Sequence, residues 1–362
     1  MDVVGQTKAD AREAAAAWFG SAPQHSLVIE PLGNGHIHQT FLLHNTAKEG
    51  ARYVLQRVNG EVYRDVELLM QQTSRLLDQL ATDIQFTNAY QVPELVITPN
   101  GQAYSYEKRP NDENAWRLWR FVDRSVTCDP PTERAQIREA AAAFGAFQRT
   151  ISVFTPGDLA QTIPGFLSMS SYLDAFDQAV DQLSQSTLQP LRQWLDLVAA
   201  SRQWPDEILR RNAMIHGDCK INNLLFDCDR KRVLAVIDLD NCMHGNWAWD
   251  FGDLVRSISY SRGGFHEEDY RTCIEGFLAG RGALPDDHST TNQLLALAPG
   301  FLAFMLGLRF LTDYISGNRY FVVSQTGENL RRAIEQFDLY RQFQTYELQM
   351  REIASKVSAN LD

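Results

Sequence analysis

Cysteine is scarce in this chain of 362 residues, which has five copies and no C-x-x-C pair. An odd number of widely spaced cysteines in a long chain argues against the disulfide framework that stabilises small secreted domains. The absence of a His/Cys cluster with ligand spacing argues against a zinc site. We therefore expect free thiols in a reducing compartment at Cys128, Cys219, Cys228, Cys242 and Cys273.

Positive charge and long apolar runs are also in short supply. Lys and Arg number 34 against 45 Asp and Glu, a net charge of −11, whereas a nucleic-acid-binding protein needs the opposite sign, at least locally. The most apolar run, residues 294–308, is broken by Pro299 and Gly300; it is too short to span a bilayer and predicts a buried helix. The N-terminal residues lack the pattern of a signal peptide. These features predict a cytoplasmic protein that binds neither nucleic acid nor membranes.

The first third of the chain mixes strand signals with one helix. A length of 362 residues allows two or three domains, or one large two-lobed enzyme. Periodic leucines predict a helix over Val66–Ala81. The turn signal Pro99-Asn100-Gly101 predicts a hairpin between the strands on either side of it. The expected strands are residues 28–30, 40–44, 53–58, 94–98, 103–107 and 116–122.

Long helices dominate after Thr132, apart from one island at Met214–Asp238. The island contains two short apolar stretches, 224–226 and 233–237, on either side of a charged turn, which predicts a hairpin. Strands followed by helices indicate an α+β fold. The expected helices are residues 133–150, 171–183, 188–202, 267–278, 301–316 and 328–356.

Residues suited to phosphoryl transfer concentrate in and after this island. In the run H-G-D-C-K-I-N-N, Asn223 follows Asp218 by five residues, and Asp238 ends the second hairpin strand. Asp218 on a loop could orient an attacking hydroxyl and accept its proton. The oxygens of Asn223 and Asp238 suit a hard cation such as Mg²⁺. Because the hairpin returns Asp238 to the end that carries Asn223, the spacing predicts a cation that neutralises charge on nucleotide phosphates.

Other polar residues of the same stretch have structural interpretations. Asp227 and Asp229 lie in the hairpin turn, where Asp is favoured for local backbone hydrogen bonds. We expect His216 to brace the loop by hydrogen bonding rather than to take part in chemistry. Asp250 is expected to cap the helix that follows it or to support the loop.

Seven motifs in order along the chain carry a resemblance to a known family. They are GNGHIHQTF at 33–41, YVLQRVN at 53–59, AAAFGAFQ at 141–148, TIPGF at 162–166, HGDCKINNLLFD at 216–227, VIDLDNCMHGNWAWDFGDLVR at 236–256 and RFLTDYISGNRYF at 309–321. With these motifs the chain resembles the aminoglycoside-phosphotransferase-like branch of the protein-kinase fold, and within it the N-acetylhexosamine 1-kinases. The resemblance implies a nucleotide-binding lobe over 1–122, with an antiparallel sheet and one helix. It also implies a mostly helical catalytic and substrate-binding lobe over 123–362.

The resemblance implies site residues as well. The family's base matches Asp218, and its metal ligands match Asn223 and Asp238. Nucleotide phosphates would lie under the loop Gly33-Asn34-Gly35, where glycine lets the backbone approach closely. The adenine would pack at the lobe junction near Phe121 and Val122. The acceptor contacts implied are His36, Asp218, Arg309 and Tyr320.

Two charged positions have more than one interpretation. Arg309 follows an apolar helix start, where a charge is costly unless it is paired or faces a cavity; a pocket role or an ion pair with Asp313 both fit. Related kinases place Lys on the third strand to hold phosphates, whereas this chain has Gln56 and Arg57. We assign Arg57 to nucleotide binding, with pairing to Glu67 or exposure to solvent as the alternatives.

These observations predict a monomeric kinase that uses ATP and Mg²⁺ to phosphorylate the anomeric hydroxyl of N-acetylhexosamines, giving the sugar 1-phosphate. The same chemistry on another small alcohol is the alternative: a different sugar, choline, homoserine or an aminoglycoside. A catalytically silent binding protein of this fold would have lost Asp218, Asn223 or Asp238, and all three are present. The chain departs from the family pattern at residues 38–39 and 167–169, beside the expected acceptor contacts, so the sequence leaves the sugar open.

Overall fold

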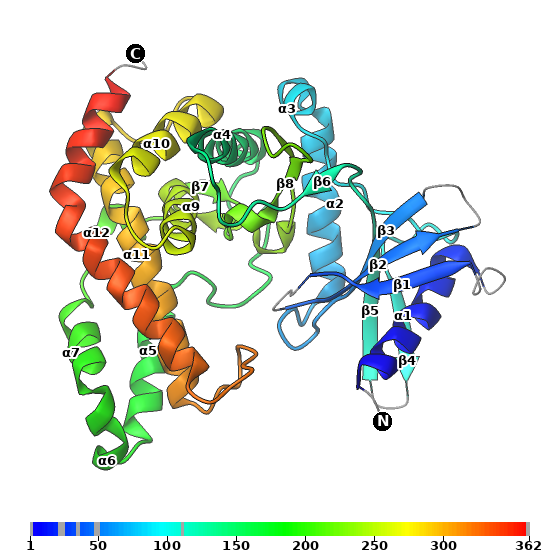
Figure 1. Ribbon diagram of the computed structural model, residues 1–362, viewed down its shortest axis with the longest axis horizontal. Coiled ribbons are helices and arrows are strands. Elements are labelled where there is room, and N and C mark those ends of the chain that lie inside the picture. Colours follow the sequence, from blue (N-terminus) through cyan, green and yellow to red (C-terminus); the bar gives the residue numbers. More distant parts are fainter. Residues whose placement is uncertain (1–2, 21–25, 34–36, 47–50, 110–111, 360–362) are drawn as a thin grey trace. The chain divides into compact units, whose positions relative to one another are not determined.

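The computed structural model describes residues 3–20, 26–33, 37–46, 51–109 and 112–359 (Figure 1). The chain divides into two compact units. The first comprises residues 1–87 and 91–125, and the second comprises residues 88–90 and 126–362.

The first unit is an antiparallel sheet covered on one face by α1 (Val3–Phe19). Its five strands are β1 (Leu27–Pro31), β2 (Gln39–Asn45), β3 (Ala51–Arg57), β5 (Asp112–Arg120) and β4 (Ser105–Arg109), in that spatial order. Alternation of side chains along β3 sends Tyr53 and Leu55 into the core against Ala15 and Trp18 of α1. The helix α2 (Val66–Thr82) begins after Asp65, whose carboxylate accepts a hydrogen bond from the Leu68 amide, and α3 (Ile84–Ala89) follows.

The prediction of a strand over 94–98 is wrong, and so is the prediction of a hairpin at Pro99. Only Leu95 forms a bridge there, to Trp119, although the Val96 amide also donates to Leu118 O. The partner of β5 along this edge is β4, which pairs with the first half of β5 and leaves the second half to this irregular segment. The expectations also missed α1, whose alanine-rich face gives a weak amphipathic pattern.

The second unit is mostly helical and contains two small sets of strands (Figure 1). The strands β7 (Ala213–Ile215) and β10 (Met243–Gly245) pair antiparallel, and β8 (Leu224–Asp227) forms the expected hairpin with β9 (Val233–Val236), next to β6 (Ser125–Val126). The helices are α4 (Arg134–Ile151), α5 (Met169–Asp181), α6 (Gln185–Leu188), α7 (Arg192–Ala200), α8 (Asp206–Leu209), α9 (Trp247–Ser261), α10 (Glu267–Arg281), α11 (His288–Ile315) and α12 (Glu328–Ser358).

Two helices differ from the sequence-based expectation because of proline. The helix expected over 188–202 starts later, as α7, because Pro190 lies in a short 3-10 turn before it. The helix expected from Phe301 instead begins after Asp287 and continues through Pro299. By length and composition α11 could cross a membrane, but 78% of its most apolar stretch is buried in the structure. It packs against α12, α9 and α5, and this burial offsets the hydrogen bond that Pro299 cannot make.

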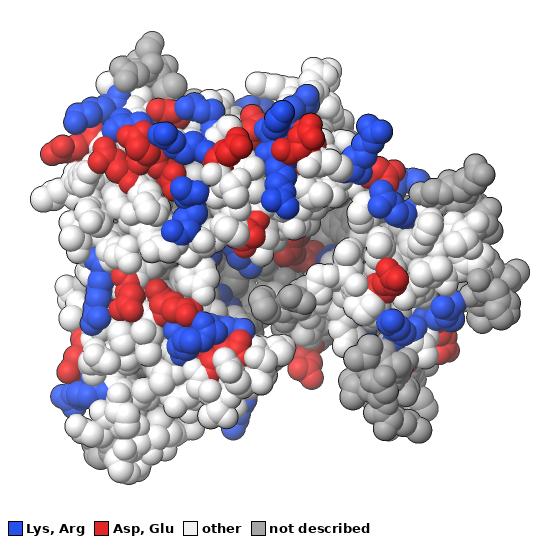
Figure 2. All heavy atoms as spheres, viewed as in Figure 1, with Lys and Arg blue, Asp and Glu red and all other residues white. Residues whose placement is uncertain are grey.

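The helices α4 and α10 pack closely because small residues face each other. A Cβ at Gly280 would lie 2.1 Å from Ala142 O, and one at Gly276 would lie 2.5 Å from Arg138 O. Acidic and basic side chains are interspersed over this part of the surface (Figure 2). Two ion pairs, Arg134–Glu268 and Arg138–Glu275, join the helices there. The approach brings the C-terminal halves of both helices together, and Phe144 and Phe147 of α4 pack against His216 in the loop that carries Asp218.

Candidate active site

Asp218 lies in a loop, residues 216–223, that follows β7; we call it the Asp218 loop. The Asn223 side-chain amide donates to Asp218 Oδ2 at 3.0 Å and to Asp218 O at 2.8 Å. The Lys220 ammonium lies 2.9 Å from the same carboxylate, whose side chain is 17% exposed. Burial raises the pKa of Asp218, but Lys220, His216 and Asn223 together outweigh it, so the net pKa is lowered. The group is therefore a carboxylate at neutral pH, with an oxygen near the surface.

A buried carboxylate on α9 holds this loop in place. Asp250 is 1% exposed; its Oδ2 accepts from the His216 amide and its Oδ1 from the Gly217 amide, both at 2.9 Å. Burial raises the pKa of Asp250, although these hydrogen bonds partly oppose the rise. Asn246, not Asp250, caps α9, so of the two roles expected for Asp250 the structure has the loop support.

His216 and Gly217 fit this loop for steric and hydrogen-bonding reasons. The buried His216 ring accepts from the Asp218 amide through Nδ1 and lies 3.0 Å from Ile237 O through Nε2, which is therefore the donor. This is the bracing role expected for it. Gly217 has φ +80°, and a Cβ there would lie 2.6 Å from Asn241 O. A larger residue at 217 would displace the loop.

The hairpin brings the two proposed metal ligands to one place. Leu224 pairs with Val236, and the Ile237 amide donates to Asn223 O at 3.0 Å, so Asn223 and Asp238 are neighbours. Asp238 has φ +65°, a left-handed conformation that is uncommon outside glycine and clusters at functional sites.

The donor set fits a hard cation. Because the Asn223 amide nitrogen donates to Asp218, its carbonyl oxygen is oriented away from that bond and can act as a ligand. Asp238 contributes a carboxylate. Oxygen ligands of this kind suit Mg²⁺ or Ca²⁺ rather than Zn²⁺.

Four aromatic rings surround the Arg309 guanidinium, which projects from α11. Its central carbon lies between 5.2 and 5.4 Å from the ring centroids of Phe166, Tyr172, Tyr320 and Phe321. Burial lowers the pKa of Arg309, but Tyr172, Tyr320 and Asp218 raise it by more, so the group stays charged. Arg309 and Asp218 are thus close enough for their charges to interact.

Asp313 does not form the ion pair with Arg309 that was the alternative interpretation. Its carboxylate accepts from the amides of Arg319 and Tyr320, both at 2.8 Å, and Phe321, at 3.0 Å. The Asn329 side chain adds a fourth hydrogen bond at 2.8 Å. These bonds shape residues 316–321, which we call the acceptor segment, and place two of its rings against Arg309.

The residues assigned to the nucleotide lie in the first unit. Asn34 and Gly35 fall outside the described residues, while Gly33 has φ +70°. His36, which was assigned to the acceptor, also falls outside the described residues. Arg57 Nε donates to Asn114 Oδ1 at 2.7 Å and its Nη1 to Gln39 Oε1 at 3.3 Å.

Glu67, the alternative partner for Arg57, accepts a hydrogen bond from the Gln71 side chain at 3.2 Å. The ring of Phe121 lies 4.2 Å below the Arg52 guanidinium, and Val122 O accepts from the Ser125 hydroxyl.

Sequence reasoning missed several members of the site. Lys220 lies inside the H-G-D-C-K-I-N-N motif, two residues after Asp218, and its spacing could have indicated the ion pair. Phe166 and Phe321 lie in two of the family motifs, but only the fold shows that both rings lie against Arg309. The remaining omissions are Tyr172 and the role of Asp313.

Fold and site together define a kinase-like phosphotransferase, and comparison with known proteins agrees. Residues 28–290 match the model of the phosphotransferase enzyme family, APH, so the chain belongs to this family. The match confirms the family-level resemblance and the two-lobed, kinase-like α+β fold expected from the motifs.

Solved structures show the same fold at low identity. A microcompartment-associated aminopropanol kinase is 16% identical over 94% of this chain and 98% of its own, with a TM-score of 0.61. An amicoumacin kinase, in complex with AMP-PNP, Ca²⁺ and Ami, is 15% identical over 94% and 96%, with a TM-score of 0.57. A choline kinase from Cryptosporidium parvum Iowa II is 14% identical over 99% and 100%, with a TM-score of 0.59.

Proposed function

We propose that the protein is an ATP- and Mg²⁺-dependent kinase that phosphorylates the anomeric hydroxyl of an N-acetylhexosamine, giving the sugar 1-phosphate and ADP. The family supports phosphoryl transfer to an alcohol. The motif resemblance supports the sugar, and the charge distribution around Asp218 supports a neutral acceptor over a cationic one.

The observation that carries this choice is the setting of Arg309. Its guanidinium remains charged within the four rings and interacts with Asp218, while Lys220 already pairs with the Asp218 carboxylate. A cationic acceptor placed against Asp218 would therefore compete with Lys220 and Arg309 for this carboxylate. A neutral sugar would offer hydroxyl and carbonyl oxygens as acceptors for the guanidinium donors, and a ring face to Tyr320, which is 46% exposed.

The proposed reaction assigns one role to each group. Asp218 orients the acceptor hydroxyl and takes its proton as the oxygen bonds to the γ-phosphorus. The bond between this phosphorus and the β,γ-bridging oxygen breaks, and ADP carries away the electron pair. Asn223 and Asp238 would hold the metal, which neutralises charge on the nucleotide phosphates when bound.

A panel of acceptors tests the proposal. ADP release should be fastest with N-acetylglucosamine or N-acetylgalactosamine and at least about tenfold slower, as kcat/KM, with glucosamine, choline or 1-amino-2-propanol. Glucosamine is the matched control, because it differs from N-acetylglucosamine by exposing the amine. Turnover of the cationic alcohols alone would reject the sugar assignment.

The second candidate is a kinase of a small amino alcohol. The similarity to proteins named as aminopropanol kinase and choline kinase supports it. Under this candidate the wild type should turn over choline or 1-amino-2-propanol faster than any sugar. The Arg309→Gln variant should turn over these amino alcohols better still.

A further inference from the structure

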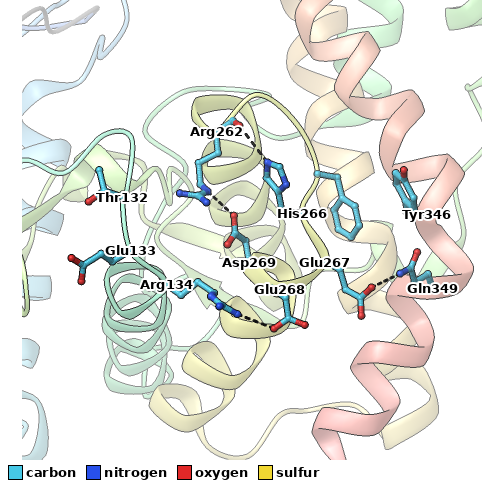
Figure 3. A pocket seen from close by; sticks show the side chains of 11 residues that line it. Thr132, Glu133, Arg134, Arg262, His266, Glu267, Glu268, Asp269, Tyr346 and Gln349 are labelled. Atoms are coloured by element: carbon cyan, nitrogen blue, oxygen red, sulfur yellow. Dashed lines mark hydrogen bonds and ion pairs between the residues drawn. The ribbon is translucent and has the colours of Figure 1, made fainter.

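Two hollows lie on the second unit outside the candidate active site, and they differ in how their charges are matched. The larger, about 810 Å³, lies at α10 and the start of α4 (Figure 3). Its arginines each have a carboxylate: Arg134 pairs with Glu268 and Arg262 with Asp269. Both arginines of this hollow are therefore already neutralised by carboxylates, and we draw no ligand from it.

The smaller hollow, about 360 Å³, contains a buried arginine without such a partner. Its wall includes Arg281, Ser152, Asn212 and the apolar side chains of Phe154 and Leu284. Arg281 is 9% exposed. Among the described residues its guanidinium donates to two neutral oxygens, Gln148 Oε1 and Ala283 O, both at 3.0 Å, and no carboxylate pairs with it.

The surroundings of Arg281 compensate its charge only in part, through the Asp250 carboxylate beyond Gln148. Burial lowers the pKa of Arg281, and the positive charge of Arg149 lowers it further, with Asp250 opposing both. A guanidinium has five N–H donors, so Arg281 retains donors beyond the two in use. A buried guanidinium with no directly bonded carboxylate is costly, and an anion in the hollow would lower that cost.

We propose that this hollow is a binding site for a phosphate-type oxyanion, either inorganic phosphate or the phosphate group of a small ester. Arg281 holds the anion through paired, charge-assisted hydrogen bonds, the geometry in which guanidinium groups bind phosphate. The apolar side chains of the wall reduce the local polarity, which strengthens these bonds.

The same arginine is linked to the Asp218 loop. Gln148 accepts from Arg281 and donates to Asp250 Oδ2 at 2.9 Å, and Asp250 holds the His216 and Gly217 amides. An anion on Arg281 therefore stiffens a hydrogen-bonded chain that ends beside Asp218. This linkage rests on the proposed function only because that function makes Asp218 the base. The binding site itself does not rest on the proposed function.

Calorimetric titration of the full chain tests the site. The protein, saturated with AMP-PNP to fill the nucleotide site, is titrated with inorganic phosphate and separately with glycerol 1-phosphate at constant ionic strength. We expect one site per chain in the wild type, and binding at least about tenfold weaker in Arg281→Gln. The tighter of the two titrants identifies the source of the anion. Arg138→Gln is the matched control, because it changes an exposed arginine of α4 that pairs with Glu275 of α10, and it should bind as the wild type does.

A second variant keeps the test decisive if Arg281→Gln does not fold. Ser152→Asp adds a negative charge to the wall of the hollow and leaves Arg281 and Gln148 in place, and it should abolish binding equally. Wild-type affinity in both variants, or no binding of either titrant to the wild type, would overturn the site.

Amide hydrogen exchange tests the linkage separately. Phosphate should slow exchange in the peptide covering residues 214–218 of the wild type and leave it unchanged in Arg281→Gln. Binding without this protection would reject the linkage. If the proposed kinase function is wrong, turnover will be absent, but the calorimetric and hydrogen-exchange results for the phosphate site will not be affected.

Discussion

The Asp218 loop and the acceptor segment are held by the same kind of hydrogen bonding, but over different distances in the sequence. In each, a buried aspartate on a helix accepts hydrogen bonds from successive backbone amides. Asp250 reaches amides 33 and 34 residues away in sequence, whereas Asp313 reaches amides six to eight residues away.

The difference in sequence distance has a physical consequence. The position of the Asp218 loop depends on the packing of α4, α9 and α10, which brings Gln148 and Asp250 together. The acceptor segment is shaped largely by its own local sequence. We therefore expect changes at Asp250 to affect kcat and stability, and changes at Asp313 to affect the KM for the acceptor.

The largest effect is expected at Asp218 itself and sets the scale for the comparison. Asp218→Asn should lower kcat by about 10³-fold or more, because the amide cannot accept the hydroxyl proton. The thermal unfolding temperature should remain close to that of the wild type. Steady-state kinetics and a melting curve measure both. Asp227→Asn, a similar change in the hairpin turn, is the control, and equal loss in both variants would mean that Asp218 is not the base.

The next largest effect is expected at Asp250. Asp250→Asn retains one acceptor oxygen where the structure uses two, so either the His216 or the Gly217 amide loses its partner. We expect kcat to fall about 10²-fold, because a small displacement of Asp218 misaligns the acceptor. The free energy of unfolding should fall by about 1–3 kcal/mol. Unchanged kcat with lowered stability would show that Asp250 supports the fold and not the loop.

Asp313 should produce a smaller and different effect. Asp313→Asn weakens the hydrogen bonds to the acceptor segment and releases Tyr320 and Phe321 from Arg309. We expect the acceptor KM to rise about tenfold while kcat and the KM for ATP change less than about threefold. Asp287→Ala at the other end of α11 removes a helix cap and should lower stability without changing KM. A kcat loss in Asp313→Asn that equals that of Asp250→Asn would erase the distinction.

The smallest expected effect is a pH dependence of stability at Asp250. Its pKa in the folded state is raised by burial above the ordinary value of about 3.9, so the folded state binds its proton more tightly than the unfolded state does. Its contribution to stability is therefore complete below about pH 4 and declines as the pH rises through the raised pKa. The stability advantage of the wild type over Asp250→Asn should shrink over this window, by at most about 1.4 kcal/mol per pH unit. Denaturant titrations at several pH values measure the difference.

Much of the fold could be predicted because its signals are local. The alternation along β2 and β3, the leucine period of α2 and the hairpin of β8 and β9 all lie within short segments. The segment 94–98 was mispredicted because competition for the edge of β5 is a tertiary effect. The start of α11 was mispredicted because Pro299 suggested a helix break that tertiary packing overrides.

The candidate site likewise has a part that local sequence predicts and a part that depends on tertiary packing. Asp218, Asn223 and Asp238 are neighbours because a loop and one hairpin connect them, and the sequence spacing contains that information. The enclosure of Arg309 joins segments more than a hundred residues apart, so neither Phe166 nor Tyr172 could be assigned to it from the sequence. For Asp313 the sequence suggested only an ion pair with Arg309, because nothing local shows that the chain turns back to bring the amides of residues 319–321 to its carboxylate.

Phosphorus NMR of a single reaction tests the central claim most directly. The wild-type protein is incubated with ATP, Mg²⁺ and N-acetylglucosamine, and the product is identified by the coupling of its phosphorus to the anomeric proton. The account predicts one new sugar 1-phosphate signal that grows with ADP and is absent with Asp218→Asn. An unchanged ATP spectrum, or a phosphate on any other hydroxyl, would contradict it.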